Sequence, residues 1–358
     1  MTARNGAAGT PLQIDESGEC PVAAKVAHLR RPESYSPAPA RVEVVETHMS
    51  WVFLTDLHAW KLKKPVRREF LDFSTLAARK ANCEAEIRLN GRLAPEVYLA
   101  VVPLALAASG ALALGGPGRP VDWLVQMRRL PHDLMLDAAI ARDAVAAADV
   151  ARIAAVLAAF YRSLAPISMP VETLRTRLTR DVRASREALS DPTYGLPAAS
   201  VAGVSDALLR FLDTHVDLLA ARVAAGRIVE GHGDLRPEHV CLLERPVVID
   251  CIEFNAEFRR LDVADELAFL ALECENLGAP DVGARLFAAC CAALDDRVPE
   301  ALFHFYAASR ALLRAKLAAW HVADVPAEMH GEWNARARRY LELAARHAER
   351  AEPAVRHA

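Results

Sequence analysis

The stretch that decides the fold is 231-GHGDLRPEH-239, together with the apolar run 246-PVVID-250 a short distance downstream. In the first segment Asp234 follows Gly233, and a glycine allows the backbone to turn tightly before the carboxylate. In the second segment Asp250 closes a run of Val, Val and Ile that has the composition of a strand. The sequence therefore predicts two carboxylates, one presented by a loop and the other by the end of a following strand.

Composition narrows the class of protein. The chain has 358 residues, of which 53% are hydrophobic, enough to bury a large core in a two-lobed protein. Its net charge of -3 gives no electrostatic signature of nucleic acid binding. The 7 cysteines form an odd set without CxxC spacing, which favours a reducing compartment and argues against structural zinc. No apolar stretch reaches the roughly 18 residues needed to cross a bilayer, and the first residues lack a signal peptide's apolar segment. We therefore expect a cytoplasmic enzyme without a membrane partner.

The expected elements change along the chain. Residues 1–38 are rich in Pro, Gly, Ser and Ala without periodicity, which predicts a disordered leader. Residues 39–130 contain β-branched and aromatic runs on either side of one helix that Ser74 or Thr75 can cap. Residues 131–352 are mainly helical, with one β interruption that ends on the second acid. The predicted fold class is α+β, with about five antiparallel strands and one helix in the first part and a helical second part.

Several motifs carry a resemblance to a known family. They are HGDL at 232–235, ID at 249–250, ETHMSWVFL at 46–54, LDFSTL at 71–76 and DCIEFN at 250–255. Together they resemble the aminoglycoside phosphotransferase family, relatives of the protein kinases, and in particular an uncharacterised branch with some members fused to a P-loop ATPase. The resemblance implies a protein-kinase-like two-lobed fold with ATP and Mg²⁺ as cofactors. It implies transfer of the γ-phosphoryl group to a hydroxyl of a small molecule, and a P-loop ATPase as a partner. The acceptor and the oligomeric state stay open.

Phosphoryl transfer needs a carboxylate near the acceptor hydroxyl and a metal ion held against the phosphates. Asp234 is the predicted catalytic base, and Asp250 is the predicted magnesium ligand because Mg²⁺ prefers carboxylate and phosphate oxygens. Arg236 is predicted either to stabilise the charge of the transferred group or to form a structural salt bridge. Glu253 has two interpretations, support of the metal site or a place in the substrate cleft.

A kinase-like fold also needs a lysine on its third strand, positioned by a glutamate of the following helix. In 59-AWKLKKP-65 the alternation directs Lys61 and Lys63 to one face of the strand, and Lys61 fits the resemblance better. The predicted partner is Glu86 in preference to Glu84, although helical phase leaves that choice open. We expect this lysine and glutamate to meet both acids in one cleft between the lobes.

The sequence predicts the residues that contact the nucleotide less clearly than it predicts the two acids. A Gly-rich phosphate loop is absent, and 47-THMS-50 occupies the turn where it would lie. Phosphate contacts there would come from backbone N–H groups and small hydroxyls. The adenine is expected near residues 125–130, with Met127 as the predicted contact.

His239 departs from the family's pattern. The resemblance implies an Asn five residues after the base whose amide oxygen binds metal, and an imidazole is a softer and poorer ligand for Mg²⁺. We predict His239 as a metal ligand that tolerates Mn²⁺ or as a brace of the catalytic loop. The alternative function is a nucleotide-binding pseudokinase or regulatory module without transfer activity. The acids Glu257, Glu273 and Glu275 either recognise a cationic acceptor or form a solvated helix face.

Overall fold

The structure is a computed structural model that describes residues 20–68 and 70–352. Contacts within the chain define two compact units, which are Met1–Pro131 with Ile249–Asn255, and His132–Val248 with Ala256–Ala358. The segment that carries Asp250 thus belongs to the first unit, whereas the loop that carries Asp234 belongs to the second.

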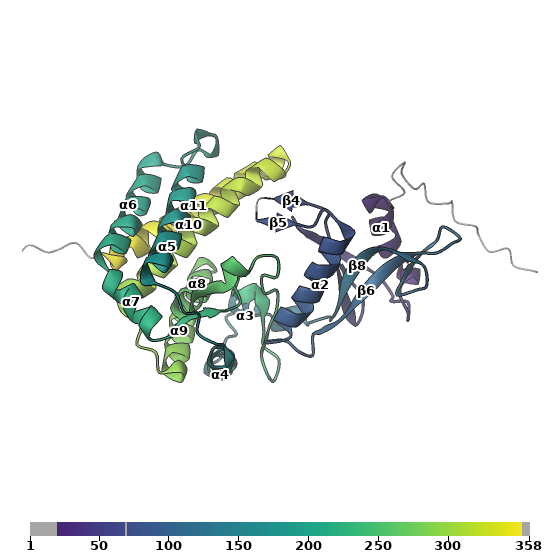
Figure 1. Ribbon diagram of the computed structural model, residues 1–358, viewed down its shortest axis with the longest axis horizontal. Coiled ribbons are helices and arrows are strands. Elements are labelled where there is room, and N and C mark those ends of the chain that lie inside the picture. Colours follow the sequence, from purple (N-terminus) through teal and green to yellow (C-terminus); the bar gives the residue numbers. More distant parts are fainter. Residues whose placement is uncertain (1–19, 69, 353–358) are drawn as a thin grey trace, which may run out of the picture. The chain divides into compact units, whose positions relative to one another are not determined.

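A six-stranded antiparallel sheet forms the centre of the first unit (Figure 1). Its strand order is β1-β2-β3-β8-β6-β7. The bounds are Glu43–Glu46 (β1), Ser50–Leu54 (β2), His58–Lys63 (β3), Tyr98–Leu106 (β6), Leu112–Leu114 (β7) and Arg119–Arg128 (β8). A separate hairpin pairs β4 (Arg67–Arg68) with β5 (Leu71–Asp72). The sequence predicted about five strands, one fewer than the sheet contains.

The alternation of β3 sorts its side chains onto the two faces of the sheet. Trp60 and Leu62 are buried in an apolar core with Leu124 of β8. Lys61 and Lys63 extend from the opposite face, as the period of a strand requires. The sequence prediction that both lysines share a face is confirmed.

The helix α2 (Leu76–Asn90) covers that second face and packs along β6 and β8 (Figure 1). It begins at Thr75, whose hydroxyl accepts the N–H of Ala78 at 3.1 Å. Of the two capping residues that the sequence offered, the structure uses the second. This cap fixes where the helix starts and so the position of every side chain along it.

The described part of the predicted leader is folded, so the prediction of disorder over 1–38 is wrong there. Val22–Leu29 forms helix α1, and its last leucine is fully buried in the apolar core of the sheet. Nζ of Lys25 donates to Oδ2 of Asp122 at 2.8 Å. An eight-residue helix is unstable alone, and these contacts with β8 and the sheet stabilise it. Residues 1–19 lie outside the described residues.

Helices build the second unit, and most of them contribute to a shared apolar core. Their bounds are Leu136–Ala141 (α3), Ala147–Ser163 (α4), Val171–Leu189 (α5), Ala198–Thr214 (α6), Val216–Ala224 (α7), Val263–Asn276 (α8), Pro280–Leu294 (α9), Glu300–Asp324 (α10) and His330–Ala351 (α11). The helices α10 and α11 lie side by side, and α10 also packs against α8 (Figure 1). None of the described helices combines the length and the apolar character that a membrane span requires.

Two short antiparallel ladders flank the loop of the second unit. The strand β9 (Ile228–Glu230) pairs with β12 (Arg260–Asp262), and β10 (Val240–Cys241) pairs with β11 (Val247–Val248). The loop leaves β9, and the 3-10 turn η4 (Pro237–His239) leads it into β10. The sequence predicted one β interruption, and the ladder between β9 and β12 is a second one.

Candidate functional site

Two lysines and three carboxylates meet in the first unit, and we call them the lysine–carboxylate network. Nζ of Lys61 lies 2.8 Å from Oε1 of Glu86 and 2.8 Å from Oδ1 of Asp250. Nζ of Lys63 lies 2.6 Å from Oε2 of Glu86 and 2.5 Å from Oε1 of Glu253. Glu86 therefore offers one oxygen to each lysine, and each lysine binds one further acid.

Burial distinguishes the members of this network. The side chains of Glu86 and Lys63 are 0% and 1% exposed, whereas those of Lys61 and Asp250 are 16% and 46% exposed. Burial by itself would raise the pKa of Glu86, but the two lysines outweigh it and lower that pKa. Burial would lower the pKa of each lysine, and the facing carboxylates raise it instead. Glu86 and both lysines are therefore charged, and the more accessible members are Lys61 and Asp250.

The backbone at Asp250 is held by side chains from two other elements. Asp250 has a φ of 63°, a left-handed conformation that costs a non-glycine residue roughly 1–2 kcal/mol. Its N–H donates to the hydroxyl of Tyr98 on β6 at 3.0 Å. The next N–H, of Cys251, donates to Oδ1 of Asn90 at the end of α2 at 2.8 Å. These two hydrogen bonds stabilise the strained backbone that presents the carboxylate.

In the second unit a buried glutamate holds the loop that carries Asp234. Gly233 has a φ of 91°, which explains the need for glycine before the acid. The carboxylate of Glu266 accepts the N–H of His232 at 3.0 Å and of Gly233 at 2.5 Å, and the hydroxyl of Tyr161 donates to it at 2.7 Å. Burial raises the pKa of Glu266, against the effect of these donors. Nδ1 of His232 accepts the N–H of Asp234 at 3.3 Å, so this histidine braces the loop as well.

Two polar side chains that follow in the loop contact Asp234 at close range. Nε of Arg236 lies 3.1 Å from Oδ1 of Asp234, an ion pair without hydrogen-bond geometry, and its Nη1 lies 2.6 Å from Oε1 of Glu238. Nδ1 of His239 lies 2.8 Å from the carbonyl oxygen of Asp234, so that nitrogen carries the proton and donates. Nε2 of His239 lies 3.3 Å from Nη2 of Arg236 and accepts from it. Both imidazole nitrogens are therefore engaged within the loop.

The predicted nucleotide contacts also lie in the first unit. Met127 is a buried residue of β8, opposite Ala59 of β3. In the turn between β1 and β2, the hydroxyl of Thr47 accepts the N–H of Ser50 at 3.0 Å and lies 3.0 Å from the hydroxyl of Ser50. These hydroxyls are thus bonded to each other within the turn, and their role with phosphate stays a prediction, as does that of Met127.

The predicted site residues form two groups, one in each unit. The first unit brings together Lys61, Glu86 and Asp250. The second unit brings together Asp234, Arg236 and His239. The meeting of both groups in one cleft stays a prediction.

Two residues that hold Asp250 were missed by sequence reasoning. Asn90 lies four residues after Glu86 and so on the same face of α2, a signal that the sequence contained. Tyr98 had no local signal, since its bond joins residues 152 positions apart in the chain.

Comparison with known protein sequences finds uncharacterised relatives of this chain. No protein-family model matches the chain. Uncharacterised proteins of Mycobacterium tuberculosis and Mycobacterium bovis are each 33% identical to it over 281 residues, which cover 77% of this chain and 54% of the relative. The chain thus spans about half the length of the curated relatives that it matches.

Solved structures of kinases are similar to the chain as well. A choline/ethanolamine kinase family protein from Mesorhizobium loti matches with a TM-score of 0.50 and 15% identity, covering 90% of this chain and 99% of that one. An aminoglycoside phosphotransferase, a thermostable mutant, matches with a TM-score of 0.49 and 13% identity, covering 87% and 96%. The first match confirms the predicted kinase-like fold, and at this identity the likeness concerns the fold alone.

Proposed function

We propose that this chain is an ATP- and Mg²⁺-dependent phosphotransferase of the aminoglycoside phosphotransferase-like kinases, with a small-molecule hydroxyl as acceptor. The observation that carries the proposal is the position of Lys61 between Glu86 and Asp250, at 2.8 Å from each. In kinase chemistry a lysine neutralises the α- and β-phosphates, a helix glutamate orients it, and an aspartate holds the metal ion. The first unit contains all three types of side chain in contact.

Exposure favours Lys61 over Lys63 as the phosphate ligand. A lysine that binds nucleotide must be reachable by it, and the Lys63 side chain is 1% exposed. Lys61 is 16% exposed and contacts Asp250, whose carboxylate is 46% exposed. In the proposed enzyme Lys63 therefore supports Glu86 from within the protein.

Asp250 is the proposed ligand of the metal ion. Among the described residues no three His, Cys, Asp or Glu side chains cluster as a metal-binding group. Magnesium is commonly held by one or two carboxylates with substrate phosphates and water, which is compatible with a single aspartate. Because both ring nitrogens of His239 are engaged, we assign that residue to bracing of the loop in preference to metal binding.

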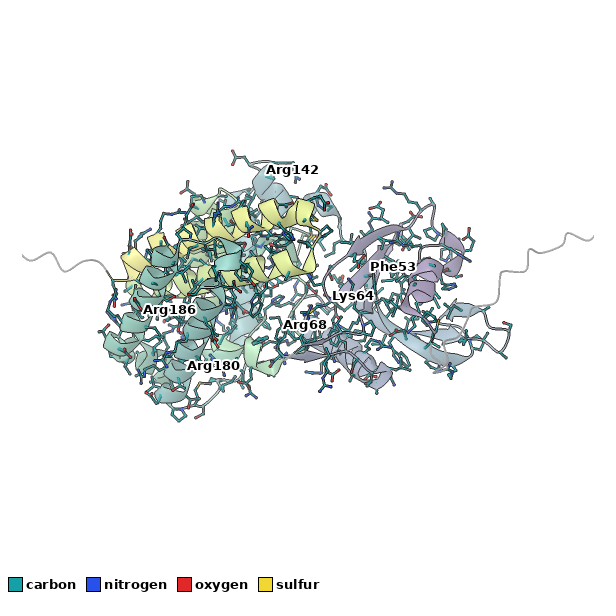
Figure 2. All side chains as sticks on the ribbon, turned by 90° about the horizontal axis from the view of Figure 1, so that it is seen from above. Phe53, Lys64, Arg68, Arg142, Arg180 and Arg186 are labelled. Atoms are coloured by element: carbon teal, nitrogen blue, oxygen red, sulfur yellow. The ribbon has the colours of Figure 1, made fainter. Side chains whose placement is uncertain are left out.

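Asp234 is the proposed catalytic base, and its substitution tests the function. The Asp234→Asn variant should bind ADP with Mg²⁺ as the wild type does, and its turnover should fall on the order of 10²-fold or more, the effect of a lost general base. The readout is ADP formation with a panel of alcohol acceptors, beside calorimetric titration of ADP and Mg²⁺. A matched control is Asp206→Asn, which alters an exposed ion pair with Arg186 (labelled in Figure 2). Equal turnover of the Asp234 variant and the wild type would remove Asp234 from this role.

A pseudokinase is the second candidate, and the histidine at position 239 favours it. A protein that has lost one metal ligand can retain ATP binding through Lys61 while transfer is absent. Tight binding of ADP with Mg²⁺ and no ADP formation across the acceptor panel, in Mg²⁺ or in Mn²⁺, would support this candidate. We further propose, from the resemblance alone, that a P-loop ATPase is the partner of this chain.

A further inference from the structure

Near Asp234 an arginine of α10 is fixed in one orientation. Nε and Nη2 of Arg310 donate to the two oxygens of Asp265 on α8, both at 2.7 Å. The guanidinium carbon lies 5.1 Å from the ring centroid of Phe269, so the planar group also stacks on an aromatic face. The Arg310 side chain is 13% exposed. Two hydrogen bonds and one ring therefore hold a guanidinium that is still partly accessible.

A second arginine of α10 is anchored in the same way one helical turn later. Nε of Arg314 lies 3.0 Å from Oε1 of Glu273 on α8, and its guanidinium carbon lies 5.3 Å from the ring centroid of Tyr340 on α11. The Arg314 side chain is also 13% exposed. Within residues 20–68 and 70–352, no acceptor takes a hydrogen bond from Nη1 of either α10 arginine.

These arginines lie beside the loop of the proposed base. Asp265, which anchors Arg310, directly precedes Glu266, which accepts two N–H groups of that loop. Burial lowers the pKa of each α10 arginine, but the carboxylate partner and also the charge of Asp234 raise it. Arg236 lies 3.1 Å from Asp234. One guanidinium group thus contacts the carboxylate that would face the acceptor, and the charge of that carboxylate also acts on two further guanidinium groups of α10.

The acids that a cationic acceptor would need are already engaged. Glu273 is 3% exposed and bonded to α10 and α11. Glu275 binds Nε2 of His347 at 2.9 Å, and Glu257 pairs with Arg260. The sequence left open whether these glutamates recognise a cationic acceptor. Their bonds within the protein argue against that role.

We propose that Arg310 and Arg314 form the recognition site for an anionic acceptor, a small alcohol that also carries a phosphate or carboxylate group. The proposal rests on the phosphotransferase function. A guanidinium that neighbouring groups hold in place loses little side-chain freedom on binding, and its planar donors match the oxygens of a phosphate or carboxylate. The unbonded Nη1 groups supply those donors, and the hydroxyl of the same acceptor would approach Asp234.

A charge series on one sugar ring tests this class of acceptor. Glucose 6-phosphate, glucuronate, glucose and glucosamine differ in charge while sharing most hydroxyls. Each is titrated into the 358-residue chain saturated with ADP and Mg²⁺, and each is assayed for ADP formation from ATP. The expected result is binding of the two anions at least about tenfold tighter than binding of glucose, the scale of one charged hydrogen bond, with glucosamine weakest.

Arg→Lys variants show whether the guanidinium groups cause the preference. Arg310→Lys and Arg314→Lys keep a positive charge beside Asp265 and Glu273 but remove the Nη1 donors. Each should weaken binding of glucose 6-phosphate about tenfold, while glucose and ADP bind as before. The matched control is Arg346→Lys, which alters an exposed ion pair of α11 and should change none of these affinities.

Equal affinity for all four sugars, or a preference for glucosamine, would overturn the proposal. So would an anion preference that survives in both lysine variants, because the site would then lie elsewhere. A failure of the phosphotransferase function gives a different set of results. ADP binding or ADP formation is then absent, but the free protein still binds anionic sugars more tightly than glucose, and the Arg→Lys variants still weaken that preference.

Discussion

Replacement of Lys63 by methionine should strongly destabilise the first unit. Lys63 is 1% exposed, and its Nζ lies 2.6 Å from Glu86 and 2.5 Å from Glu253. Methionine keeps most of the apolar stem but removes the charge, so Glu253 loses the ammonium group that it contacts and Glu86 keeps only that of Lys61. Removal of one partner from a buried ion pair costs roughly 3–5 kcal/mol, because the remaining charge stays in a medium that solvates it poorly.

The neighbouring lysine provides a matched control. Nζ of Lys64 (labelled in Figure 2) lies 2.6 Å from Oε1 of Glu46, whose side chain is 58% exposed. Because water solvates this pair, Lys64→Met should cost at most about 1 kcal/mol. The assay is urea unfolding followed by tryptophan fluorescence, with the slope of each transition checked for change.

Two results would refute this reasoning. One is a cost of Lys63→Met within about 1 kcal/mol of the cost of Lys64→Met, the range of an exposed pair. The other is strict additivity in the double variant Lys63→Met with Glu253→Gln. Since the second substitution neutralises a stranded charge, the double variant should be more stable than the sum of the two single costs implies.

Three further predictions concern other contacts. Tyr98→Phe removes the acceptor of the Asp250 N–H, so we expect a stability loss of about 1–3 kcal/mol and a higher Mg²⁺ requirement for ATP binding, measured by urea unfolding and by titration. If the protein is an active kinase, His239→Asn should gain little turnover in Mg²⁺, and a large gain in ADP formation would instead indicate a decayed site. Burial, and then the charge of His347, lower the pKa of His304 to about 4. In the unfolded chain the imidazole of His304 therefore takes up a proton below about pH 6.5, whereas in the folded chain it stays neutral down to about pH 4. The free energy of unfolding should then fall by about 1–2 kcal/mol between neutral pH and about pH 5. His304→Gln should flatten that pH dependence in urea unfolding, and an unchanged slope would exclude His304 as its source.

The sequence by itself determined the local elements and the types of side chain at the site. The alternation in β3 placed Lys61 and Lys63 on one face, and the adjacent hydroxyl residues Ser74 and Thr75 marked the region where α2 starts. The glycine before Asp234 predicted a tight turn of the backbone, and Gly233 has a φ of 91° there. Each of these features depends on residues a few positions apart, so a periodic pattern or a short motif is enough to predict it.

The tertiary structure decided which glutamate faces the lysines. Packing of α2 against β6 and β8 fixes the rotation of the helix about its axis, and this turns Glu86 inward. Oε1 of Glu84 instead lies 3.6 Å from Nζ of Lys80, and both side chains are exposed. Residues two apart on a helix point in different directions, and only the contact with the sheet shows which direction is inward.

Only the tertiary structure could reveal the contacts that join distant parts of the chain. Lys63 and Glu253 are 190 positions apart, and Lys25 of the supposed leader is 97 positions from Asp122. Helix α1 forms because the sheet buries its leucine, a contact that the sequence of its eight residues does not reveal. Such pairs depend on the path of the folded chain, and the burial that gives them their strength exists only after folding.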